Sequence, residues 1–315
     1  MKKNSLNKKK SINFIFGLIS IFLIYKIAYR TTGIDYDAYV RIYNAIQVGG
    51  VTFLKSRIEP LFVIFFLISP TRIIAFGLIG AISVFFKLKS ILTYSYYPIL
   101  SLFLYYILFF YIDDMGRVRA GIASAIMIYA IKYLGKKRYL LFLLIAFSFH
   151  KSMLLYIIIY ILYKVKLTKK KMVYIFIISL VFSLIDFSKI IYFMSLLPHI
   201  GSTASLYLFS TKRIGFSPIM IVKVFYLCLF FLNYEKLRYY KYFNELFLIY
   251  LIGNSIYFCF NSVIIIATRG SEIFTCIEFI LLPYLLKITN VKIYKIFILF
   301  CIISYFLYIR FKYTL

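Results

Sequence analysis

The segment INFIFGLISIFLIYKIAY, residues 12–29, decides the fold class of this chain. It is apolar almost throughout, and its length approaches the roughly 20 residues that one helix needs to cross a bilayer. It is preceded by Lys2, Lys3, Lys8, Lys9 and Lys10. No small-residue cleavage site follows it, so we interpret it as an uncleaved membrane anchor. The basic tail, residues 1–11, predicts a cytoplasmic N-terminus, because positive charge collects on the cytoplasmic side of membrane helices.

The rest of the chain has the same apolar character. Of its 315 residues, 63% are hydrophobic and 15% are charged, and the mean hydropathy is +0.92. Soluble domains are about 45–50% apolar and about 25% charged, so this composition excludes a water-soluble protein. We predict an all-α fold: one integral-membrane domain over residues 1–315, built as a polytopic bundle of about nine to eleven transmembrane helices.

The net charge of +28 would indicate a nucleic-acid partner in a soluble chain. Here the lysines flank apolar runs, which is the arrangement that sets membrane topology, so we expect no nucleic-acid partner. The four cysteines all lie within apolar stretches and lack the spacing of metal ligands. The sequence therefore predicts no metal site and no cofactor.

Clusters of lysine divide the chain into spans that alternate in direction. Two longer segments, residues 30–58 and 186–217, are predicted to lie on the external side of the membrane. The apolar run 60–86 is interrupted by the breaker sequence SPTR at residues 69–72, so it is either one broken span or a pair of short helices. Lys87, directly after this run, predicts that it ends in the cytoplasm.

Residues 139–163 lie between two strongly basic segments, 132–138 and 164–171, which are both predicted to be cytoplasmic. Two crossings of the membrane need about 40 helical residues, more than this stretch contains. We therefore predict two short helices in a re-entrant hairpin, with residues 149–152 at its tip. The alternative is a single ordinary span with lysines on both sides.

Arginine is distributed differently from lysine. Most lysines fall on the predicted cytoplasmic side, whereas most arginines fall on the external side: Arg30, Arg41, Arg57, Arg117, Arg119, Arg213, Arg269 and Arg310. Most acidic residues also lie at or near that side: Asp35, Asp37, Glu59, Asp113, Asp114, Asp186 and Glu272. The planar guanidinium suits phosphate and carboxylate, so the external face is typical of a site for an anionic substrate. Any single one of these charges is equally well explained as the tether of a loop in water.

The first motif is GIDYDAY, residues 33–39, in the first external segment. Carboxylates accept hydrogen bonds from sugar hydroxyls, and aromatic faces cover the C–H surfaces of sugars. We therefore predict that Tyr36, Asp37 and Tyr39 bind carbohydrate, and that Asp35 is a candidate general base. The Asp–x–Asp spacing also suits a divalent cation, but we predict no metal here.

Two further motifs carry candidate catalytic residues. In RIEPLF, residues 57–62, Arg57 is a candidate anion ligand and Glu59 a candidate base, although a carboxylate before a proline is also a common helix cap. In FHKS, residues 149–152, His150 at the predicted hairpin tip is a candidate acid or base. A buried histidine is also often only a hydrogen-bonded core residue.

Arginines mark the last two motifs, DDMGRVR at residues 113–119 and RGSEIF at 269–274. On a helix, Arg117 and Arg119 would lie about 200° apart, so only one of them can face the interior of the bundle. We expect the other to pair with one of the two preceding aspartates. Arg269 is a candidate anion ligand, and it is spaced to pair with the glutamate three residues later.

In this order the motifs resemble those of the EpsG family of bacterial exopolysaccharide, capsule and O-antigen polymerases, the Wzy-like group. The resemblance covers nearly the whole chain: G-x-D-x-x-x-Y at 33–39, E-P-L-F at 59–62, R-x-x-x-A at 119–123, F-H-x-S at 149–152, and a late Arg with a nearby Phe at 269–274. The family usually has Gln after the middle arginine, where this chain has Ala120. It usually has Tyr-Phe in the late motif, where this chain has Ile273-Phe274.

The resemblance implies an enzyme of the bacterial cytoplasmic (inner) membrane that polymerises undecaprenyl diphosphate-linked oligosaccharide repeat units on the outer face. Its partners would be this lipid-linked substrate, the bilayer, a flippase and a chain-length regulator. For the diphosphate we expect Arg119 with Arg57 and Arg269, and Arg117 is a further candidate substrate ligand. Two alternatives stay open: a transferase that adds one sugar from a lipid-phosphate donor, and a non-enzymatic flippase or transporter of lipid-linked glycans.

Overall fold

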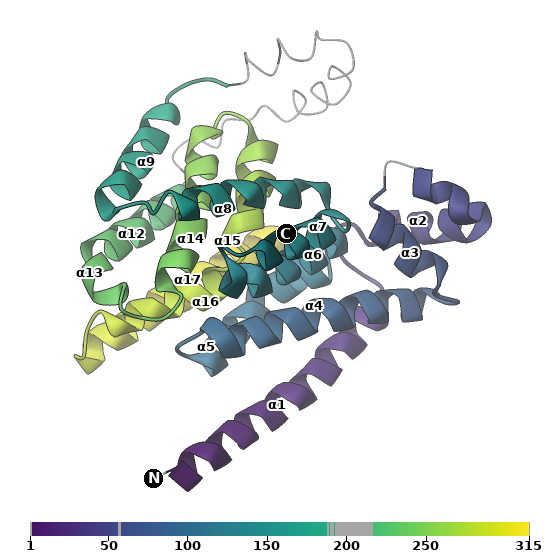
Figure 1. The fold of residues 1–315 in the computed structure, drawn as a ribbon, viewed down its shortest axis with the longest axis horizontal. Helices are drawn as coiled ribbons and strands as arrows, with labels where there is room; N and C mark the ends of the chain where they lie inside the picture. Colours follow the sequence, from purple (N-terminus) through teal and green to yellow (C-terminus); the bar gives the residue numbers. More distant parts are fainter. Residues whose placement is uncertain (1, 56–57, 188, 190–191, 193–216, 315) are drawn as a thin grey trace. The chain divides into compact units, whose positions relative to one another are not determined.

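The computed structural model describes residues 2–55, 58–187, 189, 192 and 217–314 (Figure 1). Every regular element among these residues is helical, and no strand occurs in them, so the predicted all-α fold is confirmed. The chain divides into two compact units, residues 1–154 with 306–315 and residues 155–305. The predicted segment 186–217 lies mostly outside the described residues. The expectation of a single membrane domain stays a prediction.

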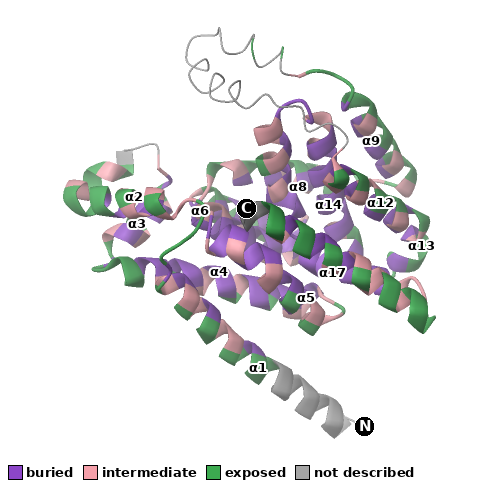
Figure 2. Cartoon of the chain, turned by 180° about the vertical axis from the view of Figure 1, so that it is seen from behind, coloured by how far each residue is buried: buried purple, intermediate pink, exposed green. Residues whose placement is uncertain are grey.

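The first unit holds the helices of the N-terminal half. They are α1 (Lys2–Ala28), α2 (Tyr36–Gly49), η1 (Gly50–Lys55), α3 (Pro60–Leu67), α4 (Arg72–Tyr94), α5 (Pro98–Leu104), η2 (Tyr105–Asp114), α6 (Val118–Ala130), η3 (Ile131–Tyr133), α7 (Lys137–Phe147) and most of η4 (Lys151–Leu155). Figure 2 shows α6 almost wholly buried, while α1 exposes much of its surface. Helix α4 lies between α1 and α6 and packs against both.

The interruption predicted at residues 69–72 is confirmed as a pair of helices, α3 and α4. Helix α4 begins after Thr71, whose Oγ1 accepts a hydrogen bond from the Ile74 N–H at 3.3 Å. The predicted end of this run at residue 86 is wrong, because α4 continues to Tyr94. Lys87 is not a topology marker at a helix end: it is buried in the middle of α4, where Asp114 neutralises it.

The predicted external segment 30–58 is largely helical. Its helix α2 is amphipathic, with Tyr39, Tyr43 and Ile46 buried on one face. That face docks on α3: Tyr43 Oη donates to the Ser69 carbonyl at 3.0 Å. Gln47 Nε2 donates to the Phe66 carbonyl at 2.7 Å. These bonds add side-chain donors to carbonyl groups at and just beyond the end of the short helix α3, where no further helical turn supplies backbone N–H donors.

A glycine closes the connection between α1 and α2. Gly33 has φ +148°, and a Cβ placed on it would lie 2.2 Å from the Met115 carbonyl oxygen. We expect Gly33→Ala to lower the free energy of unfolding by roughly 1–3 kcal/mol, because the side chain adds both backbone strain and a clash. Thermal unfolding in detergent measures it. Gly50→Ala is the matched control, since Gly50 also has positive φ but open space around it; equal losses would refute the clash.

The stretch predicted to form a re-entrant hairpin contains two short helices. Helix α7 ends at Phe147, and after η4 the helix α8 runs from Tyr156 to Lys164. At 1.5 Å per residue neither helix is long enough to cross a bilayer alone. The predicted break at residues 149–152 therefore agrees with the structure, while the re-entrant path stays a prediction.

The second unit is built around a buried helix, α14. Its elements are α8 (Tyr156–Lys164), α9 (Lys169–Phe182), α12 (Pro218–Leu232), α13 (Tyr234–Leu237), α14 (Phe243–Cys259), η5 (Ile266–Gly270), α15 (Ser271–Thr275), α16 (Glu278–Leu281), η6 (Leu282–Lys287) and α17 (Lys292–Thr314), whose end from Phe306 belongs to the first unit. Helix α14 packs against α9 and α15. Gly253 permits the contact with α15, because a Cβ there would lie 2.8 Å from the Cβ of Phe274.

Two helices in the described part of the chain are long and apolar enough to cross a membrane by themselves, Arg72–Tyr94 and Lys292–Lys312. Shorter apolar helices are Asn13–Ala28, Pro218–Leu232 and Phe243–Cys259. The apolar helices suggest a membrane protein, whereas the number of spans and their direction stay predictions.

Candidate functional site

Glu59 is the centre of a polar cluster in the first unit. Its Oε2 accepts a hydrogen bond from Arg119 Nη1 at 2.7 Å. Its Oε1 accepts one from the backbone N–H of Lys151 at 3.3 Å. The imidazole Nδ1 of His150 lies 3.4 Å from the same Oε1. Three of the sequence motifs, each from a different part of the unit, therefore meet at one carboxylate.

Backbone and aromatic contacts bring the motifs around Glu59 and His150 together. The N–H of Leu61, in the first turn of α3, donates to the Ser148 carbonyl at 3.1 Å. Pro60 at the start of α3 fixes the backbone for the helix without needing a hydrogen-bond acceptor. Phe149 is buried, and its ring lies 5.6 Å from that of Phe65. The turn after α7 is thus fastened to the first turn of α3.

Arg119 approaches Glu59 from the first turn of α6. Its guanidinium carbon lies 5.8 Å from the ring centroids of Tyr39 and Phe62, so two aromatic rings flank the cation. Arg117 takes a different direction, and its Nη2 bonds Asp113 Oδ1 at 2.9 Å. The expectation that one of the two arginines pairs with a preceding aspartate is confirmed.

The three charged or polar side chains of the cluster differ in exposure. The side chain of Glu59 is 6% exposed, whereas those of Arg119 and His150 are 28% and 29% exposed. Burial raises the pKa of Glu59, but contact with His150 and the charge of Arg119 outweigh it and lower the pKa to about 2. Glu59 is therefore ionised at neutral pH, and the partly exposed side chains of Arg119 and His150 both lie against its carboxylate.

We expect Glu59→Gln to remove a stabilisation that depends on pH. A carboxyl whose pKa falls from about 4.3 in the unfolded chain to about 2 when folded stabilises the fold fully above pH 4.3 and loses this as pH falls through 2. The loss at pH 7 is at most about 3 kcal/mol and shrinks below pH 4. Thermal unfolding from pH 7 to pH 2 measures it. Glu235→Gln, at the exposed pair with Arg238, is the control; a pH-independent loss for Glu59→Gln would contradict this.

The first motif reaches the cluster through one residue. Tyr39 is buried on the inner face of α2 and contacts Arg119. Asp35 precedes α2 and is half-buried, without a side-chain cap bond to the helix. Tyr36 is half-buried and Asp37 exposed, so these two side chains present surface near the start of α2.

Besides Arg117, which bonds Asp113, two further predicted ligands are not placed in this cluster. Arg57 lies outside the described residues. Arg269 belongs to the second unit, where it is exposed in η5. In the same unit Phe274 of the late motif is buried, and its ring lies 4.8 Å from that of Tyr156.

Arg30 is a cation that the sequence placed on the external side without a role. It is buried, donates from Nη1 to the Met115 carbonyl, and lies 4.1 Å from the ring centroid of Phe76. Burial lowers the pKa of Arg30 to about 10, so it stays protonated at neutral pH. It also lies 5.7 Å from the ring of Tyr39, on which Arg119 rests as well. The only feature of the sequence that could have marked Arg30 as a site residue is its position just before the loop that contains Gly33.

The arrangement combines a permanent cation with an imidazole whose Nδ1 lies 3.4 Å from a carboxylate oxygen. The cation suits a phosphate or diphosphate group, and an imidazole on an ionised carboxylate suits proton transfer. Within the ranges that the structure describes, His, Cys, Asp and Glu side chains form no group of three or more that could hold a metal ion.

Comparison with known families finds a match over nearly the whole chain. The model of the EpsG family matches residues 12–315, essentially the whole chain. No curated protein and no solved structure matches the chain. The resemblance that the motifs indicated is confirmed.

Proposed function

Because the chain belongs to the EpsG family, we propose that it is a polymerase that joins undecaprenyl diphosphate-linked oligosaccharide repeat units into a surface polysaccharide. Family membership suggests a glycosyltransferase-like polymerase of polysaccharide biosynthesis, and the apolar helices suggest a membrane protein. In the proposal the chain crosses the bacterial cytoplasmic membrane several times, with its N-terminus in the cytoplasm and its site at the outer face. The contact of Glu59 with both Arg119 and His150 carries the proposal.

The proposed step is a glycosyl transfer between two lipid-linked glycans. A hydroxyl oxygen of the acceptor unit attacks the anomeric carbon of the donor glycan. The bond from that carbon to the diphosphate oxygen breaks, and its electron pair leaves with the lipid diphosphate. The hydroxyl proton passes to a base of the protein. The products are one new glycosidic bond, one lipid diphosphate and one protonated base.

Arg119 is the proposed ligand of the leaving diphosphate. It is permanently charged and partly exposed, and Glu59 fixes one end of its guanidinium at 2.7 Å. The remaining N–H groups of the fork are held in place before substrate binds. A preorganised cation of this kind stabilises the charge that develops on the leaving group.

His150 is the proposed general base, and Glu59 the carboxylate that orients it. Glu59 has a pKa of about 2, which makes it a weak acceptor for a proton at neutral pH. With Nδ1 directed at Glu59, the imidazole offers Nε2 to the acceptor hydroxyl. The same carboxylate thus positions the base and the cation.

The sugar is proposed to bind beside this cluster at the start of α2. Asp35, Tyr36 and Asp37 present carboxylates and an aromatic face there. The ring of Tyr39 is covered, so in the proposal it supports Arg119 rather than contacting sugar. Arg269, exposed in η5 of the second unit, stays a candidate ligand for an anionic group.

The size distribution of the surface glycan tests the proposal. A strain that lacks the chain is complemented with the wild type, with Arg119→Ala, or with Arg238→Ala, whose arginine also pairs with a glutamate but is exposed. We expect single repeat units without a ladder in the deletion strain and with Arg119→Ala, and a ladder with the other two. Repeat units trapped inside the cell would indicate a flippase instead. A full ladder that lacks one branch sugar would indicate a single-sugar transferase.

A further inference from the structure

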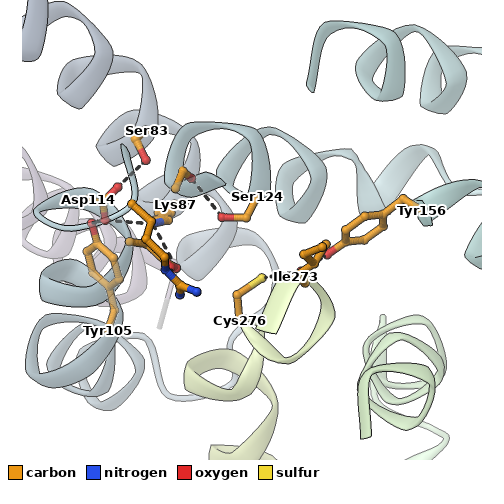
Figure 3. A network of polar contacts seen from close by, with 11 residues as sticks. Ser83, Lys87, Tyr105, Asp114, Ser124, Tyr156, Ile273 and Cys276 are labelled. Atoms are coloured by element: carbon orange, nitrogen blue, oxygen red, sulfur yellow. Dashed lines mark hydrogen bonds and ion pairs between the residues drawn. The ribbon is translucent and has the colours of Figure 1, made fainter. Parts of the chain in front are cut away.

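A buried network of polar side chains converges on Asp114 in the first unit (Figure 3). Asp114 Oδ1 accepts a hydrogen bond from Ser83 Oγ at 2.5 Å. Its Oδ2 accepts bonds from Lys87 Nζ at 2.8 Å and from Tyr105 Oη at 2.6 Å. The side chain of Lys87 is 0% exposed and that of Asp114 1% exposed. Both oxygens of this carboxylate are occupied by protein donors, so the network is an internal structure rather than a binding site.

The network continues to the residue that precedes α6. Lys87 Nζ also lies 3.8 Å from Asp113 Oδ2, and Asp113 Oδ1 bonds Arg117 Nη2 at 2.9 Å. Cations and anions therefore alternate from the middle of α4 to the start of α6. Arg119 follows in the first turn of that helix.

The turn at residues 113–117 contacts both the loop that leads to Asp35 and the helix α6 that carries Arg119. The Met115 carbonyl accepts a bond from Arg30, and Gly33 packs against the same carbonyl. On the other side, a Cβ at Gly121 of α6 would lie 2.7 Å from the Asp113 carbonyl oxygen. The loop that leads to Asp35 and the helix that carries Arg119 therefore rest on one turn.

Stability alone does not explain the burial of these charges. Taking a lysine and an aspartate out of water costs about as much as their attraction returns, and apolar residues of similar volume often serve as well. Ionisable residues inside membrane-spanning helices are rare and usually functional. We propose that Lys87 and Asp114 are positioning residues: they hold the turn at residues 113–117, and through it Arg119 and the loop at residues 30–35, in the geometry of the site.

The test compares Lys87→Met with Lys87→Arg, which keeps the charge. The matched control is Lys223→Met in the second unit, where Lys223 Nζ forms a buried ion pair with Glu278 Oε1 at 3.0 Å. Amide hydrogen exchange is measured on the purified full chain, together with kcat and KM for polymerisation. The activity part rests on the proposed function, whereas the exchange part does not.

We expect Lys87→Met to speed exchange at residues 30–40 and 113–123 roughly tenfold, because the turn loses its anchor. Lys223→Met should leave exchange in these segments unchanged. Misplaced groups lower the rate of the chemical step, so kcat should fall roughly 10- to 100-fold in Lys87→Met with little change in KM. Lys87→Arg should recover most of the slow amide exchange and most of the wild-type kcat.

If Lys87→Met exchanged at the wild-type rate in residues 30–40 and 113–123, the proposal would be overturned, whatever its polymerisation activity. If Lys87→Met does not fold, the double variant Lys87→Met with Asp114→Leu removes both buried charges. The proposal expects this double variant to fold, to exchange amide hydrogens fast at the turn, and to polymerise slowly. A double variant with wild-type exchange and wild-type kcat would overturn the proposal. A wild-type protein that does not polymerise, combined with the expected exchange pattern, would refute the proposed function and support the positioning role.

Discussion

Arg119→Ala is expected to lower kcat by roughly 100- to 1000-fold, because it removes the cation that Glu59 holds and that we propose binds the leaving diphosphate. Arg119→Lys is expected to lose at least roughly tenfold, since an ammonium is a point charge without the fork that binds Glu59 and phosphate together. Turnover of a lipid-linked repeat unit by the purified variants measures both effects.

Stability must be separated from catalysis in this test. Arg119→Ala leaves Glu59 ionised and buried, which destabilises the fold by itself. The double variant Arg119→Ala with Glu59→Gln removes this unpaired charge. We expect it to unfold at a higher temperature than Arg119→Ala and to remain slow. If the double variant regained wild-type kcat, Arg119 would be a structural partner of Glu59 and not a substrate ligand.

His150→Ala is expected to lower kcat by roughly 100-fold or more, because a positioned general base contributes an effect of this size. The imidazole is partly exposed beside Glu59, and its removal leaves a space next to an ionised carboxylate. Added imidazole should therefore restore part of the lost rate. Turnover with increasing imidazole concentration measures this recovery.

The same experiment on Arg119→Ala provides the control, since imidazole cannot replace a guanidinium. We expect recovery in His150→Ala and none in Arg119→Ala. Loss of activity in His150→Ala without recovery, accompanied by a lower unfolding temperature, would assign His150 a packing role. Undiminished kcat in His150→Ala would exclude it as the base and leave Asp35 as the candidate.

Two interruptions between helices were predicted correctly from the sequence. The breaker sequence at residues 69–72 predicted the division between α3 and α4, where Thr71 caps the second helix. A cap involves contacts within one turn, so tertiary packing does not override it. The break in the stretch 139–163 was predicted from the basic segments on both sides and from the length of the stretch.

Pairing across helices could not be predicted from the sequence. Lys87 looked like other lysines that follow apolar runs, and only its contact with Asp114 shows that it is buried. The motifs of Glu59 and His150 were recognised separately, and their meeting depends on the bond from Leu61 to the Ser148 carbonyl. The segment that forms helix α2 was predicted only as part of an external segment. Its apolar face is buried by packing on α3, and the sequence does not show that contact.

The most direct test of the central claim is reconstitution of the purified chain with undecaprenyl diphosphate-linked repeat units as its only substrate. Product length and free undecaprenyl diphosphate are measured together. The account predicts a ladder of multiples of the repeat unit, with one undecaprenyl diphosphate released for each linkage formed, and loss of both in Arg119→Ala. Products that never exceed one repeat unit, with no released undecaprenyl diphosphate, would contradict it.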